Sequence, residues 1–155
     1  MAMLKRLENA KGVVKAGIPE GATNQNGVPI PMYAAMNEFG GRIAVTDKMR
    51  GYLGAVKGVH LKKSTKYINI PSRPFMRQTV ERCRQQWSDD LKKLLLSGRD
   101  IADALELMGI RMADDIRATV KAGNFAPNRW PKPSGNPPLY DSGDMVASID
   151  YEVVL

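Results

Sequence analysis

The sequence predicts an α+β fold in which a small antiparallel β-sheet packs against two long antiparallel α-helices. Residues 74–97 and 101–122 carry apolar side chains at spacings of three and four, the period of a helix with one buried face. Residues 149–153 alternate apolar and polar side chains, as a half-buried strand does. The length of 155 residues favours one domain, so we expect residues 1–155 to fold together.

The N-terminal third is predicted to contain short elements. Residues 3–11 match a short amphipathic helix, and residues 13–18 a strand that ends before Pro19. Residues 22–31 are rich in turn formers, and the Asn26-Gly27 pair favours a tight turn. Residues 31–39 are expected to form a helix that Gly40-Gly41 ends, with a buried stripe made of Tyr33, Met36 and Phe39.

Residues 43–69 are interpreted as an insertion or hairpin arm that protrudes from the domain. Residues 43–46 are compatible with a strand, and residues 67–70 alternate as a strand that Pro71 ends. Between them, residues 47–56 are predicted to be a short helix broken by Gly51 and Gly54.

The two long helices have clear end signals. Pro74 suits the first helical position of one, Asp100 the N-cap of the other, and Gly98 and Gly123 the positions after their last turns. The short connection predicts an antiparallel helical hairpin. The expected buried faces are Met76, Val80, Cys83, Trp87, Leu91, Leu94 and Leu95, and then Ile101, Leu105, Met108, Met112, Ile116 and Val120.

A long proline-rich loop follows, over residues 124–143. It holds five prolines and Trp130, which we interpret either as an anchor on its own domain or as a contact for a partner. The segment after it, Asp141-Ser142-Gly143, is a polar turn that leads into the last strand.

The net charge of +7 is concentrated in the middle of the chain. Between Arg42 and Lys93 there are 13 Lys or Arg against four acidic residues, whereas the remainder has a net charge of −2. Contact with nucleic acid or with an acidic protein surface would use such a segment. A solvated face that keeps the protein in solution is the other interpretation, and both stay open on the sequence alone.

The residues that carry chemistry give no catalytic pattern, so we expect a protein that is not an enzyme and has no cofactor or metal. His60 has no recognisable nucleophile or orienting carboxylate beside it, and Cys83 falls on a predicted buried face. The adjacent acids at 89–90 and 114–115 diverge by about 100° on a helix. The sequence shows no membrane-spanning segment and no secretion signal.

Two charged residues stand where a helix dipole disfavours them. Glu38 comes near the end of a predicted helix, and Arg73 comes just before the start of another. An ion pair between Glu38 and Arg73 would relieve both positions, and we state it as a hypothesis.

Three segments occur in an order that resembles a known family. They are Glu38-Phe39-Gly40, then Ile70-Pro71-Ser72-Arg73-Pro74-Phe75, and then Pro138 to Met145 followed by Ser148-Ile149. With the helical pair between them, the chain from residue 13 to 155 resembles the small neck and tail-completion proteins of tailed bacteriophages, including the virion morphogenesis group of Mu-like phages. Ser142 and Met145 depart from the Thr and Leu usual there, and the basic insertion at 43–69 is longer than in minimal members.

The resemblance implies a structural virion protein at the head–tail junction, assembled in the host cytoplasm. It implies a homo-oligomer, usually a hexameric ring, that joins the tail tube to the head connector around the DNA channel. Its partners would be other neck, connector, tail-tube or terminator proteins, with non-specific contact to genomic DNA and no membrane. The candidates for the channel lining are Lys57, Lys62, Lys63 and Lys66, and those for the fold or interface are Glu38, Phe39, Arg73, Phe75, Trp130, Leu139, Asp141, Ser142 and Gly143.

Other functions remain open. A tail terminator that caps the tail tube is also a small ring subunit at this junction. A small basic DNA-binding protein is a different class, but we find no helix-turn-helix signature and no concentrated basic recognition helix. A nuclease would need a convergent acidic cluster for metal ions, which the sequence does not suggest.

Overall fold

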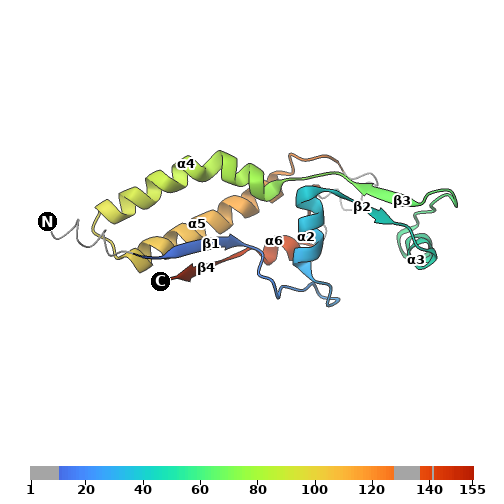
Figure 1. Ribbon diagram of the computed structural model, residues 1–155, viewed down its shortest axis with the longest axis horizontal. Coiled ribbons are helices and arrows are strands. Elements are labelled where there is room, and N and C mark those ends of the chain that lie inside the picture. Colours follow the sequence, from blue (N-terminus) through green and yellow to red (C-terminus); the bar gives the residue numbers. More distant parts are fainter. Residues whose placement is uncertain (1–10, 128–136, 141) are drawn as a thin grey trace.

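The computed structural model describes residues 11–127, 137–140 and 142–155. The helix expected at 3–11 therefore lies outside the described residues, apart from Lys11, and so do Trp130 and Asp141. The α+β class is confirmed (Figure 1). The elements are β1 (Val13–Gly17), α2 (Ile30–Phe39), β2 (Gly41–Ala44), α3 (Asp47–Lys57), β3 (Tyr67–Ile70), α4 (Phe75–Leu96), α5 (Ile101–Ala122), α6 (Asp144–Ala147) and β4 (Asp150–Val154).

The larger part of the molecule, which we call the body, is built on the α4–α5 hairpin. β1 and β4 form an antiparallel two-stranded sheet whose inner face packs on α5. In the register Ala16 pairs with Tyr151 and Lys15 with Glu152. The predicted alternation at the C-terminus is confirmed, because Ile149 is buried, Tyr151 and Val153 are half-buried, and the acids between them are exposed.

The helical hairpin begins and ends where the sequence predicts, with one shift. The Asp100 side chain accepts from the Ala102 amide at the start of α5, and Gly123 follows its last turn with φ +65°. Gly98 also has positive φ, at +85°. Pro74 is the N-cap of α4 and not its first helical residue. The local chemistry of caps therefore fixes this connection.

The buried faces of the two helices differ in width. α5 packs against α4 on one side and against β1 and β4 on another, so Leu105, Met108, Ile116 and Val120 are buried. α4 has one covered side, and only Phe75, Thr79 and Trp87 are buried on it. Val80, predicted to be buried, is 47% exposed, so that prediction is wrong.

The main core lies where α2, the start of α4, the second half of α5 and α6 meet. Its members are Ile30, Ala34, Phe75, Ala113, Ile116, Val120, Met145, Val146 and Ile149. α6 was missed by the sequence analysis because four residues are too few to show a helical period. Phe39, predicted to join the buried stripe of α2, is 70% exposed, whereas Ile30, Ala34 and Glu38 form the buried side.

A pair of buried hydroxyl groups fixes α4 against α5. The Thr79 hydroxyl lies 2.6 Å from the Thr119 hydroxyl, which also receives a hydrogen bond from Arg82. Both threonines bond their own helix as well, to the carbonyls of Phe75 and Asp115. Within the described part of the chain, no buried side-chain nitrogen or oxygen lacks a partner.

Residues 41–70 form the arm, which extends from the end of the molecule opposite the α4–α5 connection (Figure 1). β2 and β3 pair antiparallel and carry α3 at their far end. This sheet is separate from the β1–β4 sheet. α3 is continuous, so Gly51 and Gly54 do not break it. No helix or strand of the arm packs extensively on a described element of the body.

Candidate nucleic-acid interface and the base of the arm

The arm carries most of the net charge of the protein. It contains seven Lys or Arg and one acid, Asp47, which gives +6 of the formal +7. A projecting segment of this charge, with few acids to neutralise it, creates a positive field that extends into solvent. The arm is therefore the part of the described structure best suited to a polyanion or an acidic surface.

Arg50 organises the loop that presents the lysines. From α3, its guanidinium donates to the carbonyl oxygens of Leu61, Lys62 and Thr65, at 3.1, 2.6 and 3.0 Å. Three carbonyls of one loop thus share a single cation, which fixes the loop against α3. Arg50 was not singled out from the sequence, where it is one basic residue among many.

Lys62, Lys63 and Lys66 are exposed on this loop and its exit into β3. No described ion pair involves them. They are thus available to an external anion. Lys57 is the last residue of α3, and its side chain is not among those that the structure describes. On the hairpin itself, Arg42 stacks on the Tyr67 ring at 3.9 Å from its centroid.

The base of the arm is held by the chain just before and just after it. The Arg73 amide donates to the Asn37 carbonyl at 2.6 Å, and the Ser72 hydroxyl donates to the Glu38 carbonyl at 2.8 Å. Gly40 is required at this crossing, because its φ is +73° and a Cβ there would lie 2.9 Å from the Ser72 nitrogen. We call residues 37–40 together with 72–77 the clamp.

Glu38 binds the start of α4 from the last turn of α2. Its carboxylate accepts from the amides of Met76 and Arg77 at 2.9 and 3.1 Å, and from the Arg77 Nε at 3.1 Å. The residue is buried, whereas the Arg77 side chain is 56% exposed. A carboxylate of one helix therefore caps the N-terminus of another, where the helix dipole favours negative charge.

The hypothesis of a Glu38–Arg73 ion pair is wrong, because Glu38 pairs with Arg77. Arg73 points elsewhere: its guanidinium donates to the Asn37 side chain at 3.0 Å and to the carbonyls of Ala126 and Pro127 at 2.8 and 3.2 Å. Burial lowers the pKa of the Arg73 guanidinium. Arg73 thus joins the clamp to the start of the proline-rich loop.

The third segment of the resemblance packs nearby. Leu139 packs against the core and has φ +73°, a left-handed conformation uncommon for leucine. The Ser142 hydroxyl bonds the amide and the carboxylate of Asp144, the first residue of α6. Gly143, with φ +89°, precedes that helix. These contacts end the loop and set the direction of the last strand.

Comparison with known proteins leaves the family undecided. No protein-family model matches the chain, and neither the curated proteins nor the solved structures contain a significant match.

The structure separates the candidate residues by accessibility. Glu38, Arg73 and Phe75 are buried and hold the fold together, whereas Phe39 is exposed beside Arg77, whose guanidinium carbon lies 5.3 Å from the ring centroid. The partners Asn37 and Arg77 were missed by sequence reasoning. No local signal marks them, since their contacts join residues more than 35 positions apart.

The residues that could carry catalysis are scattered over the described structure. Among the described residues, no group of three or more His, Cys, Asp or Glu could hold a metal ion. His60 is exposed on the arm, and Cys83 is half-buried on α4. No helix in the described ranges has the length and apolarity needed to cross a membrane.

Proposed function

We propose that this protein is a non-enzymatic structural subunit of the head–tail junction of a tailed bacteriophage. In this role it forms a homo-oligomeric ring, taken to be hexameric, that joins the tail tube to the head connector around the DNA channel. The observation that carries the proposal is the arm, a separate hairpin with a formal charge of +6 that projects from a nearly neutral body.

The arrangement of the three segments supports the same proposal. Two of them form the clamp at the base of the arm, and Arg73 links the clamp to the loop that leads to the third. The first two segments thus share one structural task, which is to set how the arm leaves the body. An arm of fixed direction suits a ring subunit, because each copy must meet its neighbour and the channel at a repeated geometry.

The lysines of the arm are suited to non-specific contact with DNA. Lys62, Lys63 and Lys66 lie on a loop that Arg50 holds in place, and they have no acidic partner among the described ion pairs. Lysine on a loop binds phosphate as a point charge and reads no base edges. Such contact suits a channel through which any sequence passes.

The salt dependence of DNA binding tests this part of the proposal. Replacing Lys62, Lys63 and Lys66 together by Gln is expected to reduce the magnitude of the negative slope of log K against log salt by about 2 to 3. The matched control changes Arg84, Lys92 and Lys93, three exposed basic residues of α4, to Gln. Equal effects of the two triple variants would contradict a role specific to the arm. Tight binding to one DNA sequence would instead favour a free DNA-binding regulator.

Particles made without the protein test the junction role itself. We expect separate heads and tails by electron microscopy and loss of infectivity, both restored by supplying the intact chain. Tails of uncontrolled length would point to the terminator function instead. Normal joined, infectious particles would refute the proposal.

A further inference from the structure

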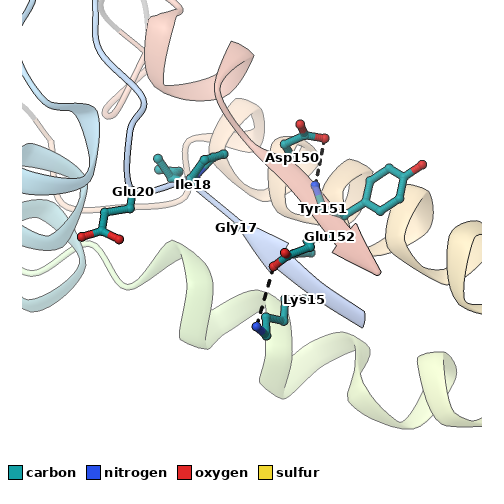
Figure 2. Close-up of a pocket in the computed structure, with 9 residues that line it drawn as sticks. Lys15, Gly17, Ile18, Glu20, Asp150, Tyr151 and Glu152 are labelled. Carbon is teal, nitrogen blue, oxygen red and sulfur yellow. Dashed lines mark hydrogen bonds and ion pairs between the residues drawn. The ribbon is translucent and has the colours of Figure 1, made fainter. Parts of the chain in front are cut away.

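The outer face of the β1–β4 sheet borders an open cleft of about 450 Å³ (Figure 2). Glu20, Asp150 and Glu152 line it together with one cation, Lys15, so its side chains have a formal charge of −2. Ile18 and Pro19 add apolar surface. This acidic, partly apolar cleft belongs to the body and takes no part in the clamp.

The cation in the cleft is weakly held. Lys15 lies 3.7 Å from Glu152, and both side chains are about two-thirds exposed. An exposed pair of this kind contributes about 0–1 kcal/mol, so another cation can replace Lys15 at little cost. The Asp150 carboxylate accepts from the adjacent Tyr151 amide and stays exposed.

The outer side of α3 carries the complementary chemistry. Lys48, Tyr52 and Val56 recur every four residues and therefore share one face of the helix. Tyr52 is 54% and Val56 60% exposed, whereas Met49 and Leu53, on the side that faces the rest of the arm, are half-buried. One cation beside two exposed apolar side chains matches a cleft with surplus carboxylates beside Ile18 and Pro19.

We propose that the outer face of α3 in one copy of this chain docks in the β1–β4 cleft of the next copy. The inference rests on the proposed ring and names its contact. Lys48 pairs with the carboxylates of the cleft, and Tyr52 and Val56 cover Ile18 and Pro19. The arm points away from the body (Figure 1), so a second copy is the occupant that the charge and the geometry favour. The contact joins two different faces, as a closed ring requires.

The proposed docking gives the arm two separate contacts, one with DNA and one with the next copy. The lysines of the 61–66 loop lie outside the 48–52–56 stripe, so they stay available to DNA while α3 is docked. Changes to the stripe should therefore affect contact between copies, and changes to the loop should affect DNA binding.

Cysteine crosslinking of the full chain tests the contact. In a Cys83→Ala background, Tyr52→Cys and Lys15→Cys variants are mixed under mild oxidation; Lys15→Cys leaves all three carboxylates in place. We expect a disulfide-linked dimer from the mixture and a ladder of higher multimers from the chain that carries both cysteines. Val80→Cys, at 47% exposure on α4, replaces Tyr52→Cys in the control. Equal crosslinking by the control, or an equal yield from Tyr52→Cys alone, would overturn the proposal.

Charge reversal provides the second measurement. Lys48→Glu should slow the Tyr52–Lys15 crosslink by roughly tenfold, and adding Glu152→Lys on the partner variant should restore it. Lys62→Glu makes the same charge change on the DNA-facing loop and should leave the rate unchanged. Equal slowing by both lysine variants would refute the specific docking.

The outcomes separate this inference from the proposed function. If the ladder is absent while particles lacking the protein fail to join heads to tails, the cleft contact is wrong and the junction role stands. If the ladder forms while such particles join normally, the junction role is wrong and the contact between copies stands.

Discussion

Replacing Glu38 should destabilise the protein far more than its place near a helix end suggests. Glu38→Ala removes a buried carboxylate that accepts from the Met76 and Arg77 amides and from the Arg77 side chain. The two amides belong to the first turn of α4, where no carbonyl of the helix can accept from them. They lie beside buried Phe75, so they lose their partner in a place with limited access to water.

The magnitude follows from these three bonds. Loss of an N-cap acceptor costs about 1 kcal/mol, and hydrogen bonds to a charged group contribute about 1.5–3 kcal/mol. The ion pair adds about 0–1 kcal/mol because Arg77 is largely exposed. We therefore expect Glu38→Ala to lower the free energy of unfolding by about 2–4 kcal/mol. Glu38→Gln keeps one acceptor oxygen and should cost about half as much.

Urea unfolding followed by circular dichroism measures the effect. Arg77→Gln is the partner control and should cost at most about 1 kcal/mol. Glu81→Gln, an exposed glutamate on the same helix, should change stability by less than about 0.5 kcal/mol. The reasoning fails if Glu38→Ala costs no more than Glu81→Gln, or if Arg77→Gln matches it.

Three further predictions concern other parts of the molecule. Gly109→Ala should lower the thermal midpoint, because the new Cβ would lie 2.2 Å from the Tyr151 ring. The cost of overpacking, about 1–3 kcal/mol, exceeds the gain in helix propensity, about 1 kcal/mol. An unchanged midpoint would contradict this. Arg50→Met should speed amide exchange in the 61–66 loop by roughly tenfold or more and leave α5 unchanged, since three loop carbonyls lose their donor. The Tyr151 hydroxyl donates to Glu106 at 2.8 Å, and this hydrogen bond raises the pKa of Tyr151. The hydrogen bond therefore stabilises the folded state fully below about pH 10, and its contribution is lost as the pH rises through the higher folded pKa. Glu106→Gln should return the pKa of Tyr151 toward 10.0 in an NMR titration of the ring signals; no change would remove Glu106 as the cause.

The features that the sequence predicted well depend on neighbours along the chain. Asp100 and Gly123 mark the ends of α5 because caps act within one turn, and residues 67–70 form a strand as their alternation indicates. For the same reason the alternation of residues 149–153 predicted which of their side chains are buried. These signals need no knowledge of what packs against the element.

The features that escaped prediction depend on distant parts of the chain. Val80 is exposed because β1 and β4 cover α5 and leave that side of α4 open. α3 continues through Gly51 and Gly54, although each glycine costs about 1 kcal/mol. Thr46 caps its start, Gly58 ends it, and Met49 and Leu53 on one side of it are half-buried. Glu38 pairs with Arg77, and opposite charge alone did not distinguish Arg77 from Arg73.

The candidate site was predicted in part. The basic character of residues 43–69 placed Lys62, Lys63 and Lys66 on a projecting segment, because charge of one sign is seldom buried. Counting charges did not reveal that Arg50 is occupied by loop carbonyls or that Arg42 stacks on Tyr67. Side-chain geometry separates the cations that support the arm from those that it presents.

The clamp has a mechanical consequence. Two backbone segments connect the arm to the body, one at Gly40 and one at Pro71. Both are held by hydrogen bonds between the last turn of α2 and the residues at the start of α4. A force applied at the tip of the arm is thus transmitted to the body through these hydrogen bonds. The torque falls on Glu38 and the start of α4, while Ile116, Val120 and Ile149 lie behind it in the core. We therefore expect the clamp to break under force before the rest of the body unfolds.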